Sequence, residues 1–328
     1  MNTLKHYTDG SYSLKDYMIY LKYYFVNSGY RLFYAKLTGK KPNLKKYAGK
    51  EILEPEYGND YIRDMIVDGK PFMAGRFGSG ELRAFVEGIG VKLNIRTKIK
   101  NTTLDALCTN AGFFPRTQEA AKKFTEFMAN ACQHADLIGV WLNIMEDYVI
   151  RIYARNAKLS MPRAIEPYYH DIPWSSALAG KKVLVIHPFQ RSILSQYKKR
   201  EFLFTNKNVL PEFELKTLKA VQTIAGERSK FRTWFDALDY MVDRALSMEF
   251  DVAIIGCGAY GFPIAAKLKK AGKQAVHMGG ATQILFGIKG KRWDNHPEIS
   301  KLYNKYWVRP LPEETPINSD KIEGGCYW

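Results

Sequence analysis

The chain of 328 residues is long enough for one large or two modest domains, and with 46% hydrophobic and 14% aromatic residues it is able to bury a full apolar core. Its formal net charge of +16 excludes a generally acidic surface and favours anionic partners, such as nucleic acid, an anionic membrane or a phosphorylated small molecule. Its four cysteines are far apart and show no CxxC spacing, which excludes a disulfide framework and fits a reducing cytoplasm.

Residues 1–65 are predicted to form a basic, aromatic, helical leader. Residues 1–50 hold ten Lys or Arg against two Asp, a net charge of +8 and half of the total. Tyrosines and phenylalanines beside lysines are typical of a helix that rests on an anionic membrane surface, here the inner face of the membrane. Such a helix also often packs its aromatic face on its own domain, and both interpretations remain open. Charged residues interrupt the apolar stretch 17–37, so no bilayer-spanning segment is expected there.

After the leader, apolar runs that suit strands alternate with stretches that suit helices. Strands are expected at residues 71–74, 137–141, 183–186, 213–221, 252–255 and 274–278. Helices are expected from Ser79, at residues 117–132, 192–204 and 233–248, and from about Pro263 to Gly272. This alternation predicts an α/β fold in residues 66–310, a Rossmann-like and mostly parallel sheet with helices on both faces. A sub-boundary is possible near residues 175–182, and residues 311–328 are expected to be a tail.

Ligands of such sheets bind at the carboxyl ends of the strands, where this sequence has four candidate turns. The first, RFGSGE at residues 76–81, contains Gly78 and Ser79 between Arg76 and Glu81. The flexible turn is suited to bring both charged groups to a substrate. There Glu81 would accept a proton from a hydroxyl or bind a divalent cation. A glutamate in the first turn of a helix is also favoured by the helix dipole alone, and this interpretation remains open.

The second candidate turn is HPFQRS at residues 187–192, between an expected strand and a helix that Ser192 is predicted to cap. His187 is suited to donate a hydrogen bond to a ligand oxygen, or simply to end the strand. Arg191 is suited to bind a phosphate, and a solvated basic helix face is the alternative. The loop NAGFFP at residues 110–115 is a further segment that suits a substrate, although ordinary loops look similar.

The third candidate turn, GCGAYG at residues 256–261, lies within the most informative stretch of the chain. Its residues Gly256, Gly258, Tyr260 and Gly261 match the dinucleotide-binding pattern G-x-G-x-x-G. An NAD site also needs a carboxylate about 20 residues further on to hold the ribose hydroxyls, and this chain has His277 there. We therefore expect the turn to bind a phosphate and expect no NAD. An ordinary tight turn of an α/β sheet is the alternative.

The fourth candidate turn follows the last expected strand, and the residues expected to contribute to the site there are His277, Gly279, Gly280, Thr282 and Gln283. Backbone amides at the start of the next helix are suited to bind an anion. Lys291 and Arg292 follow, with Trp293 as a stacking surface for a base or a sugar. Between residues 252 and 293 the chain carries seven Lys or Arg and no Asp or Glu, which suits a diphosphate.

Two separated motifs, RFGSGEL at residues 76–82 and GCGAYGFP with HMGGATQILFGIKGKRW at residues 256–293, together resemble bacterial proteins with a GT-D-type glycosyltransferase fold. The segments GKKVLVIHPF and QYKKR are similar to the same group, so the resemblance covers residues 71–293. It implies a Rossmann-like sheet, a nucleotide-sugar donor and a glycan or lipid-linked acceptor. It also implies an intracellular role in building surface polysaccharide or glycoprotein glycans. No helix-turn-helix, zinc finger or RNP motif is present, so nucleic acid is not an expected partner.

The resemblance also bears on metal binding. The better-characterised enzymes of the group carry an Asp-x-Glu motif in the first turn, thought to serve a divalent metal, whereas this chain has Ser79-Gly80-Glu81. Only Glu81 carries over as a ligand for Mn²⁺ or Mg²⁺, so the expected site is either completed by the donor diphosphate or free of metal. Two other functions remain open, a non-catalytic protein that binds nucleotide sugars and, less favoured, a Rossmann NAD(P)-dependent oxidoreductase.

Overall fold

The computed structural model describes residues 12–328 except 41, 43, 228 and 323. Its described residues form one nine-stranded sheet in the order β1-β2-β5-β4-β3-β9-β8-β6-β7. The strands are β1 (Lys46–Tyr47), β2 (Lys50–Leu53), β3 (Phe72–Gly75), β4 (Leu137–Gly139), β5 (Lys158–Ser160), β6 (Lys182–His187), β7 (Glu214–Lys219), β8 (Val252–Ile255) and β9 (Gln274–His277). The pair β1 and β2 is antiparallel and the other neighbours are parallel, which confirms the predicted fold class.

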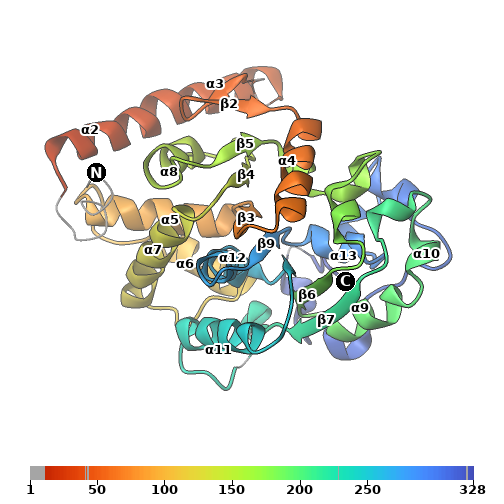
Figure 1. Ribbon diagram of the computed structural model, residues 1–328. Helices are drawn as coiled ribbons and strands as arrows, with labels where there is room; N and C mark the ends of the chain where they lie inside the picture. Colours follow the sequence, from red (N-terminus) through yellow and green to blue (C-terminus); the bar gives the residue numbers. More distant parts are fainter. Residues whose placement is uncertain (1–11, 41, 43, 228, 323) are drawn as a thin grey trace.

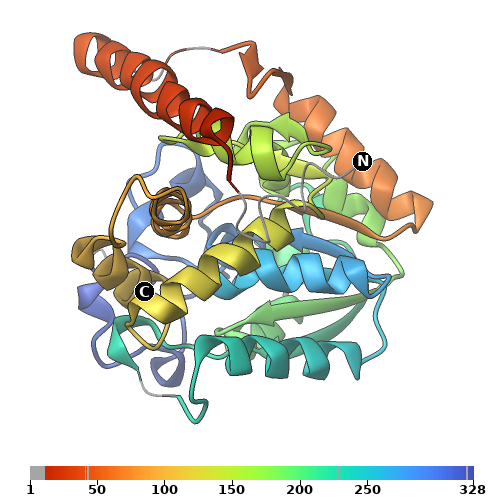
Figure 2. The same cartoon turned by 90° about the vertical axis from the view of Figure 1, so that its left-hand side faces the viewer.

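Helices cover both faces of the sheet (Figures 1 and 2). One face packs on α5 (Ser79–Lys92), α7 (Gln118–Cys132), α8 (Glu146–Tyr153), α11 (Trp234–Leu246) and α12 (Gly261–Lys270). The other packs on α4 (Pro55–Asp68), α9 (Gln190–Tyr197) and α13 (Ala281–Leu285). Strand β6 contributes side chains to the apolar core on both faces of the sheet. Leu184 and Ile186 lie in the core on the α5 side, and Val183 and Val185 lie in the core on the α4 side. Burial on both sides explains why the central strands are continuous apolar runs.

Helices α7 and α11 begin at the threonine side chains that cap them. The Thr117 hydroxyl accepts from the backbone of Ala120 at the start of α7, and Thr233 forms a capping box with Asp236 at the start of α11. At the end of α12, Gly272 has a φ of +85°, a conformation that glycine adopts most easily. These boundaries match the predicted helices to within two residues.

The predicted helix at residues 192–204 is wrong in its start and its continuity. Helix α9 begins at Gln190 and ends at Tyr197, and a short helix α10 follows over Arg200–Leu203. Ser192 therefore lies inside the helix and does not cap it. The cap comes from far along the chain, because the Glu314 carboxylate accepts the backbone N–H of Arg191 at 2.6 Å.

The order of the strands creates a crevice beside β6. The chain leaves β6 through α9 toward β7 at the edge of the sheet, and then returns through α11 to β8 on the other side of β6. From the neighbouring strands β6 and β8 the chain therefore continues in opposite directions, through α9 to β7 on one face of the sheet and through α12 to β9 on the other. Ligands of open α/β sheets bind outside the carboxyl ends of the strands at such a switch point.

The helix of residues 14–38 and the C-terminal segment both pack against the sheet domain. Helix α2 (Leu14–Leu21), a π-helical turn (Lys22–Asn27) and α3 (Ser28–Thr38) form one continuous helix at the outer edge of the molecule (Figure 1). No helix of the described residues is long and apolar enough to cross a membrane. Residues 1–11, Lys41 and Asn43 of the predicted leader lie outside the described residues. The segment 311–328, expected to be a tail, packs against the start of α9 through Glu314. Strands that precede and strands that follow residues 175–182 belong to the same sheet.

We expect Gly88→Ala to destabilise the protein by about 1–3 kcal/mol, the usual cost of overpacking a close helix contact. A Cβ at Gly88 in α5 would lie 1.9 Å from the Thr125 hydroxyl oxygen of α7. The matched control is Gly29→Ala in α3, where a Cβ meets nothing within 4 Å. Urea denaturation measures the free energy of unfolding of both variants, and an unchanged value for Gly88→Ala would contradict this account of the α5–α7 contact.

Candidate functional site

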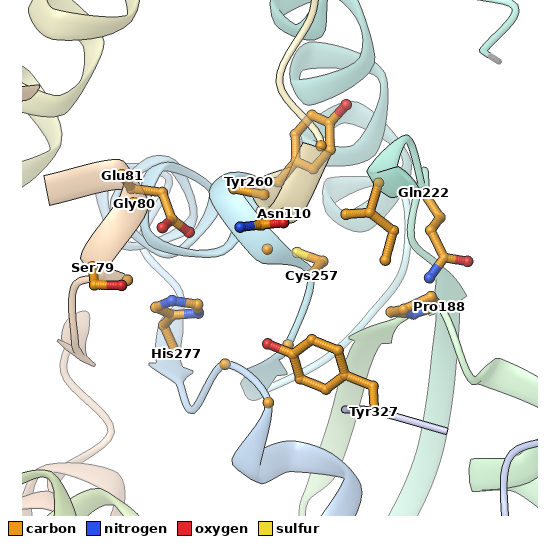
Figure 3. Close-up of a pocket in the computed structure, with 18 of the residues that line it drawn as sticks. Ser79, Gly80, Glu81, Asn110, Pro188, Gln222, Cys257, Tyr260, His277 and Tyr327 are labelled. Carbon is orange, nitrogen blue, oxygen red and sulfur yellow. The ribbon is translucent and has the colours of Figure 1, made fainter. Parts of the chain in front are cut away.

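A cavity of about 530 Å³ lies at the carboxyl ends of β3, β6, β8 and β9 (Figure 3). In the sheet Ile186 is opposite Ile255 and Ile255 is opposite His277, so the turns after these strands begin at nearly one level. Pockets for small ligands usually measure roughly 300–1,000 Å³. The cavity therefore has room for a small molecule or a nucleotide.

All four turns predicted from the sequence contribute to the wall of this cavity. The predicted site residues that line it are Arg76, Gly78, Ser79, Glu81, His187, Gly256, Gly258, Tyr260, His277, Gly279, Gly280, Gln283 and Arg292. The loop at residues 110–115 also reaches the wall, through Asn110 to Gly112. Segments that are distant in sequence thus meet at one place.

The floor of the cavity depends on a close approach of two turns at Gly256. A Cβ on this residue would lie 2.6 Å from the Gly279 carbonyl oxygen and 2.8 Å from the His187 ring. Gly279 itself has a φ of +60°. Side chains at these positions would separate the turns, whereas glycine leaves bare backbone at the wall. Three amides at the starts of α12 and α13 already donate to carbonyls of the turns before them, Gly261 to Gly258, Thr282 to Gly279 and Gln283 to Gly280.

Arg191 lies outside the cavity, which corrects the prediction that it binds a ligand phosphate there. Its side chain is 69% exposed and pairs with Glu313 at 2.7 Å. The start of α9 is already occupied by the carboxylate of Glu314, which is 5% exposed and also accepts from the Ser192 hydroxyl. A side-chain anion of the chain itself therefore fills the place that the sequence assigned to a ligand.

Three other predicted residues lie outside the wall. A Cβ on Gly261 would lie 2.1 Å from the His277 ring, so Gly261 makes room for that ring from behind. Thr282 is fully buried and its hydroxyl has no hydrogen-bond partner among the described residues. The Lys291 ammonium donates to the Gly324 carbonyl at 2.9 Å, away from the cavity. Gly261 and Thr282 support the wall, and Lys291 holds the C-terminal segment.

Glu81 is folded back over the start of its own helix. Gly78 is the N-cap of α5, and a Cβ on Gly78 would lie 2.2–2.6 Å from the Glu81 carboxyl atoms. This is the position from which a glutamate reaches back toward an N-cap. The carboxylate also lines the cavity and points toward it beside His277 (Figure 3). Both interpretations of Glu81 are therefore compatible with its position.

Arg76 is held in place by a carboxylate and an aromatic ring. Its Nη1 donates to Glu166 at 2.5 Å, and its guanidinium carbon lies 5.3 Å from the Trp141 ring centre. The guanidinium also lies within 4 Å of the point where a Cβ on Gly279 would be. Arg76 thus bridges the first and fourth turns, while Glu166 balances its charge.

Both histidines of the site are buried and uncharged. Burial lowers the pKa of His187 to about 3, and burial together with the nearby Arg76 lowers the pKa of His277 to about 3. His187 Nδ1 accepts the Phe189 N–H at 3.0 Å, so its Nε2 carries the proton. His277 Nδ1 lies 3.3 Å from the Ile255 carbonyl oxygen, so there Nδ1 carries the proton and Nε2 accepts. One ring therefore presents a donor and the other an acceptor.

Several residues of the wall were not expected from the sequence. Arg83 is exposed at the rim, and no carboxylate of the described residues pairs with it. Trp141 was predicted as the end of a strand at residues 137–141, but β4 ends at Gly139 and Trp141 lies in the loop that lines the cavity. Tyr327 and Trp328 come from the expected tail, and Tyr327 reaches into the cavity (Figure 3). The position of Arg83, two residues after Glu81, was a usable signal, whereas nothing local shows that the C-terminus returns to the site.

The residues present do not fit a resident divalent metal ion. Among the described residues, no group of three or more His, Cys, Asp or Glu side chains is placed to hold a metal. Glu81 is the one carboxylate in the described wall, and Ser79 stands where the resemblance led us to expect a second. Mg²⁺ and Mn²⁺ prefer several oxygen ligands, so this donor set is incomplete.

No protein-family model matches this chain, and no curated protein matches it. Two solved structures are similar to it. One is described as "The highly conserved domain of unknown function 1792 has a distinct glycosyltransferase fold", with 13% identity and a TM-score of 0.40. The other is the "Selenomethionine substituted structure of domain of unknown function 1792 (DUF1792)", with 13% identity and a TM-score of 0.41. Each match covers 71% of this chain and 79% of the other.

The buried histidines make stability dependent on pH. The unfolded chain takes up protons at its histidines below an ordinary pKa of about 6.5, whereas His187 and His277 in the folded protein do so only near 3. The unfolded state therefore binds more protons in this window, and stability falls as the pH drops from about 6.5 toward 3. We expect up to about 1.4 kcal/mol per pH unit from each histidine. Chemical denaturation at several pH values measures this slope, and a His187→Asn variant with the wild-type slope would contradict it.

Proposed function

We propose that this protein is a glycosyltransferase that moves a sugar from a nucleoside-diphosphate sugar to a hydroxyl of a glycan or lipid-linked acceptor in surface polysaccharide biosynthesis. The observation that carries the proposal is the composition of one wall. Glycine turns from β8 and β9, cations at Arg83 and Arg292, and the carboxylate of Glu81 border the same cavity. A diphosphate leaving group needs the first two, and an attacking hydroxyl needs the third.

The donor is proposed to bind with its diphosphate against the turns at Gly256 and Gly279. Backbone N–H groups within the glycine turns and the protonated Nε2 of His187 would donate to the phosphate oxygens. Gln283 fixes the C-terminal segment beside this place, because its Nε2 donates to the carbonyls of Ile288 and Tyr327.

Aromatic side chains beside the phosphate turns are suited to hold the base or the sugar. The Arg292 guanidinium carbon lies 4.4 Å from the Tyr327 ring centre and 5.5 Å from that of Trp293. A Cβ on Gly280 would lie 2.8 Å from Tyr327, so this ring lies directly on the turn. Planar groups of a nucleotide sugar stack favourably on a ring such as that of Tyr327. Trp293, predicted as a stacking surface, is buried and lies outside the wall of the cavity.

In the proposed reaction the acceptor oxygen forms a bond to the anomeric carbon of the sugar while the bond from that carbon to the diphosphate oxygen breaks. The hydroxyl proton passes to the Glu81 carboxylate. The nucleoside diphosphate leaves with its additional negative charge, which Arg83, Arg292 and the amides of the glycine turns stabilise. Water is the alternative acceptor and would give slow hydrolysis of the donor.

A non-catalytic protein that binds nucleotide sugars is the second candidate, and the single carboxylate of the wall favours it. The two functions share the donor site and differ in turnover. An NAD(P)-dependent oxidoreductase is least favoured, because the uncharged His277 ends β9 where an NAD site needs a carboxylate.

We expect a nucleoside-diphosphate sugar to raise the unfolding temperature of the protein, because a ligand that binds only the folded state stabilises that state. UDP-, GDP- and dTDP-sugars are compared with a CMP-sugar, which has one phosphate, and with NADH. Arg83→Gln should weaken donor binding about tenfold through the loss of a charge-assisted hydrogen bond. The control Arg244→Gln removes an exposed cation on α11 and should bind like the wild type. Absence of any shift with every diphosphate sugar would refute the donor site.

We expect Glu81→Gln to lower transfer or donor hydrolysis by at least about 100-fold, the usual effect of removing a general base. The amide keeps the shape of the side chain over Gly78 but does not accept a proton at neutral pH. Release of nucleoside diphosphate measures turnover, and titration calorimetry measures the donor Kd, which should stay within about threefold because the change is isosteric. Full turnover by the variant would remove Glu81 from the mechanism. Donor binding by a wild type that shows no turnover would favour the binding-protein alternative.

A further inference from the structure

Exposed apolar side chains are concentrated on the helix formed by residues 14–38. Nearly half of the large hydrophobic side chains exposed in the described part of the chain lie on it: Leu14, Tyr17, Met18, Phe25, Val26, Tyr30, Leu32, Phe33 and Leu37. Phe33 is 68% exposed and Leu37 is 74% exposed. Water contact of this extent along one helix is unfavourable and marks an interaction surface.

The charge on this helix is positive. Lys15, Lys22 and Lys36 are exposed, and no ion pair among the described residues involves them. Asp16 is the one acidic residue of residues 14–38, and it is buried in the capping box with Ser13. The exposed face therefore combines apolar and aromatic residues with lysines and presents no carboxylate.

The opposite face of the helix is already bound to its own domain. Arg31 forms a buried ion pair of 2.7 Å with Asp147, and the Asn27 amide donates to the same carboxylate at 3.2 Å. The Tyr20 ring packs edge-on against Tyr148 at 5.3 Å between centroids. The two interpretations left open by the sequence therefore concern two different faces, and only the inner one is used by the domain.

We propose that the outer face of this helix rests on an anionic lipid bilayer, lying in the plane of the interface. The helix is about 37 Å long and runs along the outer edge of the molecule, with one side turned away from the rest of the protein (Figures 1 and 2). Apolar side chains would enter the boundary of the acyl chains, tyrosines would lie at the headgroups, and lysines would face anionic phosphates. The complementary charge favours a bilayer over a second basic copy of this chain.

A loop connects this helix to the cavity. In residues 140–145, Asn143 lines the cavity, and its carbonyl accepts from Arg31 Nη2 at 3.4 Å. The Met145 N–H donates to the Ser28 hydroxyl at 3.2 Å. Trp141 and Ile144 of the same loop are exposed apolar residues. The loop at the mouth of the cavity thus packs on the inner face of this helix and exposes two apolar side chains to solvent.

The connection assigns a class of acceptor, and this step rests on the proposed glycosyltransferase function. A hydroxyl carried on a long apolar chain in the bilayer would reach the cavity past Ile144 and Trp141. Glu81 is fixed on the same rigid body as the membrane helix, through the α5 contact of Tyr20, whose hydroxyl donates to the Val86 carbonyl at 3.3 Å. The helix would therefore set the distance between the bilayer and the reacting groups.

The test is flotation of the full chain with vesicles of phosphatidylcholine, with and without phosphatidylglycerol. The face variant is Phe25→Glu/Phe33→Glu/Leu37→Glu. The matched control is Val67→Glu/Leu246→Glu/Ile317→Glu, which places the same charge at three exposed apolar sites elsewhere. We expect the wild type and the control to float with the anionic vesicles and to be released by salt, and the face variant to bind at least tenfold less.

Equal flotation of the face variant and the wild type, or no flotation of the wild type, would overturn the proposal. A dimer of the wild type in light scattering without lipid, lost in the face variant, would instead assign the face to a second copy and overturn it as well. Thermal shifts with nucleotide sugars separate this failure from that of the proposed function. Donor binding without flotation would remove only the membrane face, and flotation without donor binding would remove only the glycosyltransferase site.

Discussion

The cavity depends on the contact at Gly256, where the turns after β6, β8 and β9 meet without space for a side chain. The Gly279 carbonyl and the His187 ring both lie within 3 Å of the point where a Cβ would be. This contact brings three strand ends together and buries the two histidines beside them, and burial keeps both rings uncharged at neutral pH. The polarity of the floor is therefore a consequence of backbone packing and not of added charged residues.

The buried carboxylate of Glu314 has a comparable effect on the outer side of the cavity. It occupies the start of α9, where the helix dipole and the orphan amides favour an anion. The segment that carries it then returns to the site, because Trp328 Nε1 donates to the Glu314 carbonyl and the Trp328 carbonyl accepts from Lys291 N–H. One intramolecular cap thus removes a competing phosphate site and delivers Tyr327 to the wall.

Local patterns were enough to predict the α/β class, the strands β6, β8 and β9 and the capped helices α7 and α11, because each depends on residues near one another in sequence. The same is true of the turns that form the floor. The errors arose where distant segments decide the outcome. Nothing in HPFQRS shows that a glutamate more than a hundred residues away would cap α9 and leave Arg191 at the surface. The division into domains and the donor identity stay predictions.

The wall of the cavity combines one carboxylate, Glu81, with several arginines, and these two kinds of group suit different parts of a ligand. Next to a diphosphate, an ionised Glu81 would be repelled, so the anionic part of a ligand belongs near Arg83, Arg292 and the glycine turns. Glu81 is held apart from these turns, on α5 and over Gly78. A neutral nucleophile is the partner that tolerates a carboxylate and gains from it, since its proton must leave as the bond forms. Glu81 and Arg83 follow β3, whereas the glycine turns and Arg292 follow β8 and β9. A proton acceptor placed apart from the glycine turns suits transfer to a hydroxyl better than simple storage of a nucleotide.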